Sequence, residues 1–301
     1  MRASLRFIFL SRRPQRLRAG WRILLQTAFD LGTYVCLHFV FFRNISSSSQ
    51  QAFVFNQLIL LASTTLSIFV ARRSLDRRSF DSLGLHINTW MLWDLVFGFG
   101  LAGLLIVGIY GFELQAGWLT FKGYTWQHIP LDTILSETFA GFLVLGICPS
   151  WQEELTHRGY WLQNIKEGLN LALGIALTSI FFAVSHLRNP HATTLSTLII
   201  FIAGLWLVYA WLSTRQLWLP LGLHAGWNFF EGIVFGFPVS GYQSFHLIEQ
   251  TVSGPTWITG GAFGPEAGLV GLVAIALGVL CVFAWSRWRT YWDQQTQISS
   301  P

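Results

Sequence analysis

The sequence predicts an all-α fold, a polytopic membrane helix bundle of about eight transmembrane helices. Of the 301 residues, 52% are hydrophobic and only 11% are charged, whereas roughly a quarter of the residues in ordinary globular chains are charged. The mean hydropathy is +0.49, and 26 Phe and 15 Trp exceed what one compact core could hide from water. This composition excludes a secreted disulfide scaffold, a soluble dinucleotide-binding enzyme and a disordered tail.

Eight apolar segments are long enough to cross a bilayer, which takes about 20 residues per helix. They are residues 23–42, 52–71, 92–112, 131–151 with a helical continuation, 169–187, 195–214, 219–237 and 267–288. The same count divides the chain into a basic N-terminal segment (1–22), one membrane domain (23–288) and a short tail (289–301). The longest connection, residues 238–266, is expected to be an irregular loop that could act as a lid.

The positive charges support this count and predict its orientation. If both termini are cytoplasmic, sixteen of the 19 Lys and Arg residues fall on the cytoplasmic side and three fall outside, as the positive-inside rule requires. Seven of them are arginines in residues 1–22, ahead of the first span. The apolar stretch among them is too short for a cleavable signal peptide. We therefore expect a multi-pass protein of the plasma (inner) membrane with both termini in the cytoplasm.

Neither the excess of basic residues nor the cysteines indicate a partner other than the lipid bilayer. Because the cations flank apolar spans, they indicate contact with the lipid bilayer and no nucleic-acid partner. Cys36, Cys148 and Cys281 lie far apart inside apolar runs, which favours buried small hydrophobic residues over a disulfide or a thiolate metal site.

Ionisable residues inside the spans are the candidates for function, because each costs about 2.5–3.5 kcal/mol to insert. Those near span ends are interpreted as interfacial residues or as helix–helix hydrogen bonds; they are Asp30, His38, Asp94, Asp132, Glu137 and Glu231. The others gather in three places along the chain.

The first place is the run Pro149-Ser-Trp-Gln-Glu-Glu-Leu-Thr-His-Arg158. Adjacent helical residues point about 100° apart, so Glu153 and Glu154 cannot share one task. Glu154 and Arg158 are four residues apart and can pair on one face, which leaves Glu153 for the bundle interior. Pro149 should kink the helix and free a carbonyl near this run.

His186 ends the fifth span, and His224 and Asn228 share one face of the seventh. Gly222 and Gly226 form a small-residue pair that allows close helix approach there. At 1.5 Å per residue, Glu153 and His186 lie about 22 and 27 Å from the turn at residue 168, and are therefore expected at nearly the same depth.

These motifs, in this order on an eight-span chain, resemble the CPBP family, also called Abi or type II CAAX prenyl endopeptidase-like intramembrane proteases. The resemblance covers residues 76–237 and rests on Glu153-Glu154-x-x-x-Arg158, Phe182-x-x-x-His186 and His224-x-x-x-Asn228. His157 departs from the family, which usually has an aromatic residue at this position. It either replaces that ring in packing or adds a ligand or a neighbour that tunes Glu153.

The resemblance implies hydrolysis of a peptide bond in a membrane cavity open to the cytoplasm, on a peptide or protein substrate at the membrane. We expect Glu153 to act as general base on a water molecule, with His186 holding that water or a metal. His224 and Asn228 are expected to stabilise the oxyanion, and Glu154 and Arg158 to support the site or to orient the substrate.

Members of the family are described both as metalloproteases and as glutamate-dependent proteases. Glu153, His186 and His224 are ligand types that could bind zinc or another divalent metal, but the chain has no His-Glu-x-x-His signature. The sequence does not decide whether a metal takes part in the reaction.

Two other functions use the same residues. A non-catalytic membrane scaffold or bacteriocin-immunity protein would keep the fold and tolerate the loss of Glu153. A transporter would use the polar residues as a proton or ion relay, which favours carboxylates spread through the membrane depth. Convergence of the polar groups at one depth favours the protease.

Overall fold

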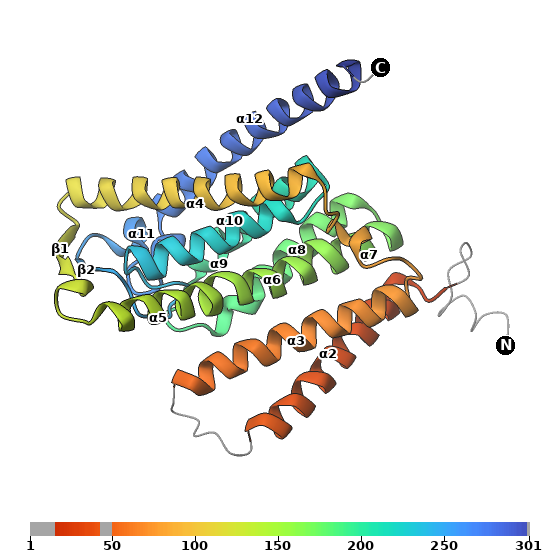
Figure 1. The fold of residues 1–301 in the computed structure, drawn as a ribbon, viewed down its shortest axis with the longest axis horizontal. Coiled ribbons are helices and arrows are strands. Elements are labelled where there is room, and N and C mark those ends of the chain that lie inside the picture. The colour runs from red at the N-terminus through yellow and green to blue at the C-terminus, as the bar shows by residue number, and fades with distance from the viewer. Residues whose placement is uncertain (1–15, 43–49, 300–301) are drawn as a thin grey trace.

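The structure, a computed structural model, describes residues 16–42 and 50–299 and is a helix bundle (Figure 1). The α-helices are α2 (Ala19–Phe42), α3 (Gln50–Ser74), α4 (Thr89–Gln115), α5 (Leu131–Gly141), α6 (Cys148–Glu154), α7 (Leu162–Gly168), α8 (Leu171–Ser185), α9 (Thr194–Thr214), α10 (Trp218–Asn228), α11 (Thr256–Thr259) and α12 (Leu269–Ser299). Arg2, Arg6, Arg12 and Arg13 of the predicted basic segment lie outside the described residues.

Shorter elements connect or extend these helices. Three π-helical segments, η3 (Phe142–Ile147), η4 (Leu155–Trp161) and η6 (Phe229–Val234), continue α5, α6 and α10. The 3-10 turns are η1 (Asp81–Leu83), η2 (Thr125–Gln127), η5 (His186–Arg188) and η7 (Pro265–Ala267). Because η3 and η4 join α5, α6 and α7, residues 131–168 form one helical span of 38 residues, as the predicted continuation requires.

Within the described residues, seven helices are long and apolar enough to cross a membrane, which confirms the all-α polytopic bundle. The eighth predicted span, residues 219–237, is α10 together with η6, and it ends at Val234. This segment is shorter than the seven spans and lies inside the bundle. Leu219 and Leu223 are fully buried in it.

Glycines allow α10 to lie directly against α4. A Cβ atom on Gly226 would be 2.6 Å from the backbone oxygen of Phe99, and one on Gly98 of α4 would be 2.6 Å from that of Leu219. A Cβ on Gly222 would overlap the carbonyl of Leu95. The small-residue pair predicted around His224 therefore does permit close backbone approach.

The segment from residue 238 to 266 is more ordered than the sequence predicted. It contains strand β2 (Ile248–Val252), which pairs antiparallel with β1 (Leu119–Tyr124), and the short helix α11. The expectation of a wholly irregular loop was wrong, because a strand of five or six residues is stabilised by a partner more than 120 positions away in the chain. That partner leaves no local signal in the sequence.

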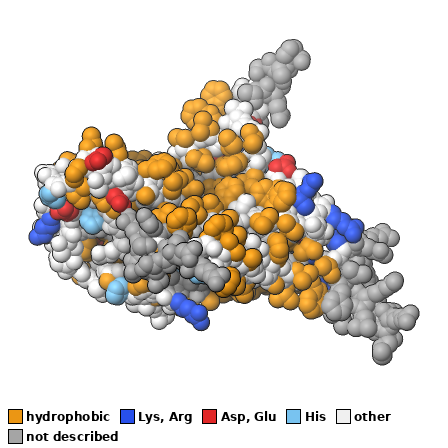
Figure 2. All heavy atoms as spheres, turned by 60° about the horizontal axis from the view of Figure 1, so that its bottom comes forward, with side chains coloured by type: hydrophobic (Ala, Val, Ile, Leu, Met, Phe, Trp, Pro, Cys, Tyr) orange, Lys and Arg blue, Asp and Glu red, His pale blue; other side chains and the backbone are white. Residues whose placement is uncertain are grey.

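The outer surface is apolar, and polar residues inside the bundle connect helices. Hydrophobic side chains cover a broad area of the face shown in Figure 2; Leu31, Phe39, Leu104 and Leu280 are each more than 60% exposed. Asp94 accepts hydrogen bonds from Trp285 Nε1 at 2.9 Å and from Arg289 Nη1 at 2.6 Å. This bond between α4 and α12 agrees with the predicted helix–helix role of Asp94. The chain is a multi-pass membrane protein.

Candidate active site

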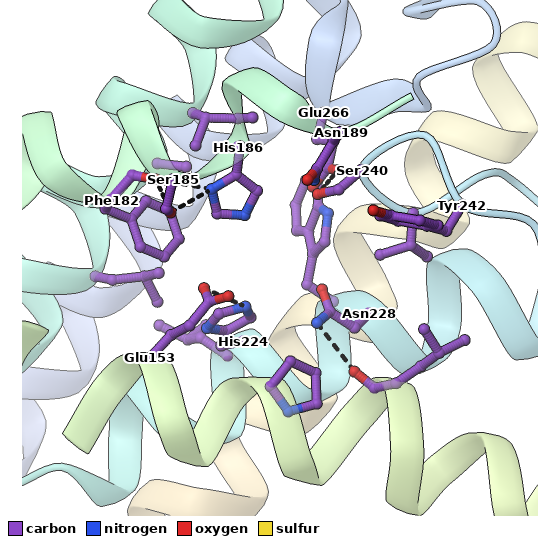
Figure 3. Close-up of a pocket in the computed structure, with 18 of the residues that line it drawn as sticks. Glu153, Phe182, Ser185, His186, Asn189, His224, Asn228, Ser240, Tyr242 and Glu266 are labelled. Atoms are coloured by element: carbon purple, nitrogen blue, oxygen red, sulfur yellow. Dashed lines mark hydrogen bonds and ion pairs between the residues drawn. The ribbon is translucent and has the colours of Figure 1, made fainter. Parts of the chain in front are cut away.

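A cavity of about 390 Å³ lies within the bundle, and the predicted catalytic residues Glu153, His186, His224 and Asn228 all line it (Figure 3). Its walls come mainly from α3, the 131–168 helix, α8, α9, α10 and the segment between η6 and η7, with Glu266 of η7 and Ile275 of α12. The packing thus joins three motifs that are separated in the chain.

Glu153 and Glu154 point to different surroundings, as their angular separation predicts. The side chain of Glu154 is fully buried and accepts a hydrogen bond from Arg158 Nη1 at 2.9 Å. The side chain of Glu153 is 27% exposed and lines the cavity. Of these two carboxylates, only Glu153 lines the cavity.

Arg158 connects the helix of the two carboxylates to its neighbours. Its Nη2 donates to the carbonyl of Gly204 in α9 at 3.0 Å, and its guanidinium lies 4.4 Å from the centre of the Phe182 ring in α8. Arg158 itself is fully buried. The charge is thus paired and hydrogen-bonded, as a buried cation must be, and it holds three helices in register.

His224 is oriented by this ion pair. Its Nδ1 lies 2.9 Å from Oε1 of Glu154, so Nδ1 carries a proton that it donates to the carboxylate. Its Nε2 then faces Glu153, with 3.9 Å between Nε2 and Oε2 of Glu153. This separation is too long for a hydrogen bond. A water molecule about 2.8 Å from both atoms would fit beside them.

His186 is fixed by the helix that it ends. Its Nδ1 lies 2.7 Å from the carbonyl oxygen of Phe182, and a carbonyl can only accept, so Nδ1 is the protonated nitrogen. Figure 3 shows the ring of His186 across the cavity from Glu153 and His224. The Phe182 ring lies 5.0 Å from the ring of His186 and 6.0 Å from that of His224, and thereby packs against both histidines.

Asn228 is held by the carbonyl that Pro149 leaves free. In a regular α-helix the Leu145 carbonyl would accept from the backbone N–H of residue 149, which proline lacks. It accepts instead from Asn228 Nδ2 at 3.1 Å. The predicted effect of Pro149 thus appears as a bond that fixes the amide of Asn228, whose second N–H remains for a ligand.

His157 lies behind the cavity wall. It is 7% exposed, its Nδ1 lies 2.9 Å from the Glu153 carbonyl, and its ring packs edge-on against Trp161 and Phe182. It is not among the residues that line the cavity. This position favours the packing interpretation, in which the imidazole replaces an aromatic ring.

The predicted metal ligands do not form a compact group. Among the described residues, no three His, Cys, Asp or Glu side chains lie close enough together to hold a metal ion. Glu153 and His224 are neighbours, but no nitrogen of His186 lies within 4 Å of either carboxylate. The donor chemistry suits zinc, whereas the spacing in this conformation does not. Metal binding by Glu153, His186 and His224 stays a prediction.

Sequence reasoning missed the residues that the segment between η6 and η7 brings to the cavity. Ser240 and Tyr242 line it, and Ser240 donates a hydrogen bond to Glu266, which lines it as well. Burial raises the pKa of the Glu266 carboxyl above its ordinary value. Glu266 also lies near Glu231, which the sequence placed at a span end and which is fully buried. Nothing in the local sequence marks Ser240, Tyr242 and Glu266, because these three lie outside the predicted apolar spans.

The chain matches the type II CAAX prenyl endopeptidase Rce1-like family over residues 135–230. No curated protein matches it. The matched part, about a third of the chain, includes Glu153, Glu154, Arg158, His186, His224 and Asn228. These residues line the cavity or lie directly behind its wall. By this match and these motifs, the membrane core of the chain is similar to the CAAX-type intramembrane endopeptidases of the CPBP, or Abi, family.

Proposed function

We propose that this protein is an intramembrane endopeptidase that hydrolyses a peptide bond of a membrane-associated polypeptide, with Glu153 as general base. The observation that carries the proposal is the pairing of Glu153 with His224 across 3.9 Å at the wall of the cavity. The buried carboxylate of Glu154 fixes the ring of His224 from behind. This arrangement supports activation of one water molecule.

Glu153 takes a proton from a water molecule that also donates to Nε2 of His224. The resulting hydroxide attacks the carbonyl carbon of the scissile peptide bond. When the carbon–nitrogen bond breaks, the protonated Glu153 returns its proton to the leaving amine, so that one water and one peptide bond become a carboxylic acid and an amine. Removal of such a positioned base typically lowers the reaction rate by about 10²–10⁴-fold.

Asn228 supplies an N–H to the tetrahedral oxyanion, since its amide is already held by the Leu145 carbonyl. A neutral His224 that donates Nδ1–H to Glu154 has no second N–H for the oxyanion. We therefore assign His224 to the water, and not to the oxyanion as the sequence alone suggested. His186 bonds to the Phe182 carbonyl through Nδ1. Its Nε2 therefore serves as an acceptor for a backbone N–H of the substrate.

The supporting residues act through His224. Glu154 and Arg158 are both fully buried, so neither reaches a substrate in the cavity. Their role is to hold the tautomer and the orientation of His224. We place the protein in the plasma membrane, with a peptide or protein substrate at the membrane as its partner.

The proposal is tested by comparing the protein termini in membranes of cells that produce the wild type or Glu153→Gln. New amino and carboxyl termini should be present with the wild type and absent with Glu153→Gln. A matched control is Glu249→Gln, because Glu249 lies in β2 and outside the cavity. It should give the wild-type termini.

Thermal unfolding of purified Glu153→Gln in detergent checks that the variant is folded. If a folded Glu153→Gln produces the same termini as the wild type, Glu153 is not a catalytic base and the protease proposal is wrong. Retention of cellular function by that variant would then favour a non-catalytic scaffold.

A further inference from the structure

The cavity has acidic side chains on its walls and no fixed positive charge. Glu153 and Glu266 line it, and no Lys or Arg lines it in the described part of the chain. Arg158, which is buried behind the wall, is already paired with Glu154. The histidines of the cavity are neutral in the proposed reaction. A positively charged group of a bound molecule is therefore attracted to this cavity.

Glu266 is the acidic residue on the wall that the proposed reaction does not use. Ser240 holds it in place, because the hydroxyl of Ser240 donates a hydrogen bond to Oε1 of Glu266 at 2.5 Å. Figure 3 shows these two side chains across the cavity from Glu153. A hydrogen bond donated to a carboxylate favours its ionised form. Glu266 is thus presented to the cavity as an anion, on the side opposite the proposed general base.

The backbone fixes the position of Ser240. Its φ is +48°, in the left-handed region that residues other than glycine seldom adopt. The next residue, Gly241, has φ +85°, and a Cβ atom on it would overlap the carbonyl of Pro190. This segment is therefore seated against the end of α8. Costly backbone conformations of this kind persist where the surrounding packing determines them, so the fold sets the place of the Glu266 carboxylate.

A second carboxyl group, that of Glu231 in η6, lies beside Glu266 and is fully buried. The indole of Trp227 and the backbone N–H of Glu266 lie near it, but neither oxygen of Glu231 has a hydrogen-bond partner of good geometry in the described part of the chain. Two carboxylates so close repel each other, so one proton is retained between them. Glu231, which lacks a donor to stabilise a charge, is the neutral member. The pair then has one negative charge, on Glu266.

This charge has no cation to pair with on the described cavity wall, and an unpaired charge is costly where water is partly excluded. Aromatic rings surround the same space: Trp206, Trp227 and Tyr242 line the cavity, and the first two rings meet edge to face with centroids 6.2 Å apart. Aromatic faces attract ammonium and guanidinium groups. A metal ion fits less well, since no three His, Cys, Asp or Glu side chains among the described residues form a group that could hold one.

We propose that the cavity binds a lysine or arginine side chain of the substrate, and that Glu266 is the specificity residue that pairs with it. The inference rests on the proposed function for the cleavage, whereas binding of the basic side chain depends on the cavity alone. Glu153 and Glu266 are on opposite walls of a cavity of about 390 Å³. The substrate class is therefore a polypeptide segment with a basic residue close to the scissile peptide bond.

Peptide capture tests this specificity without any cleavage. The probe is a mixture of synthetic peptides in which random alanine, leucine and phenylalanine flank one central residue, which is lysine, arginine, norleucine, glutamine or glutamate. Purified Glu153→Gln is immobilised in detergent, and the captured peptides are quantified by mass spectrometry. This variant is inactive in the proposed reaction, and it leaves Glu266 as the acidic residue of the described cavity wall. We expect lysine and arginine peptides to be enriched at least about tenfold over norleucine peptides, as a hydrogen bond to a charged group allows.

Further substitutions in the Glu153→Gln background assign the enrichment to Glu266. Glu266→Gln should abolish it, and Glu266→Lys should instead favour peptides with a central glutamate, which a merely structural role of Glu266 does not predict. The matched control is Glu249→Gln, because Glu249 lies in β2 and outside the cavity; it should keep the enrichment. Thermal unfolding in detergent checks that each variant is folded.

Equal capture of lysine and norleucine peptides, or capture of neither, would overturn the proposal, and so would enrichment of lysine that persists in a folded Glu266→Gln. The proposal is also wrong if magnesium chloride removes the enrichment and sodium chloride of the same ionic strength does not, because the site would then be that of an inorganic cation. If lysine peptides are enriched but Glu153→Gln leaves the protein termini in membranes unchanged, the specificity stands and the proposed function fails. The reverse result would leave the proposed function standing without this specificity.

Discussion

The buried pair of Glu154 and Arg158 gives the sharpest prediction about how the site is held. Arg158→Met removes the bond of Nη1 to Glu154 at 2.9 Å and the bond of Nη2 to the Gly204 carbonyl at 3.0 Å. The carboxylate of Glu154, which is fully buried beside His224, then has no cation to pair with. We expect the variant to be folded less stably and to lose the fixed orientation of His224.

The magnitude follows from the two bonds and from burial. Hydrogen bonds to charged groups contribute about 1.5–3 kcal/mol each, and removal of one partner of a buried ion pair typically costs about 3–5 kcal/mol. We therefore expect Arg158→Met to lower the free energy of unfolding by about 3–5 kcal/mol. The exposed pair of His128 and Glu249 has side chains 57% and 35% exposed, so Glu249→Gln should change the free energy of unfolding by less than about 1 kcal/mol.

The assay is denaturant unfolding in detergent micelles, followed by tryptophan fluorescence, on Arg158→Met, on Glu154→Gln and on the double variant that combines them. The double variant has no unpaired buried charge, so it should be more stable than the sum of the single effects predicts. A free energy of unfolding for Arg158→Met within about 1 kcal/mol of the wild type would refute the reasoning, since a broken buried pair costs more than that. Strict additivity of the two substitutions would also refute it.

Three further predictions concern packing, the oxyanion and metal. Gly98→Ala should destabilise the protein by about 1–3 kcal/mol, because its Cβ would meet the backbone of α10; Gly100→Ala on the same helix meets nothing within 4 Å and should be neutral in the same unfolding assay. Asn228→Ala should reduce the rate of cleavage by about 10²–10³ with an unfolding midpoint close to that of the wild type, and a wild-type rate would remove Asn228 from the oxyanion site. Treatment with a chelator should leave cleavage unchanged if Glu153 and His224 activate water alone; loss of activity that zinc restores would instead show a metal at these residues.

Much of the site could be predicted from the sequence because its parts are local. The 100° step between Glu153 and Glu154 and the spacing of four to Arg158 fix which side chains share a helical face. The missing N–H of Pro149 fixes a free carbonyl one turn earlier. Both consequences are present, as the pair of Glu154 with Arg158 and the bond from Asn228 to Leu145.

The rest depends on contacts between distant segments. Glu154 and His224 are 70 positions apart, and nothing in either motif tells that Glu154 orients His224 and thereby turns Nε2 toward Glu153. Ser240, Tyr242 and Glu266 come from a connection that the sequence described only as a loop. Their place at the cavity follows from the docking of that segment against Pro190.

The sequence by itself determined that this is a polytopic helical membrane protein. It also identified the candidate site residues, because inserting an ionisable side chain into a membrane costs free energy. Those properties are sums over single residues and helical turns, and need no knowledge of neighbours. Only the tertiary structure decided that Glu153 faces the cavity beside His224, and that Glu154 orients the ring of that histidine. The physical reason is that a close-packed interior selects one arrangement of helices, and that arrangement sets the distances between residues far apart in the chain.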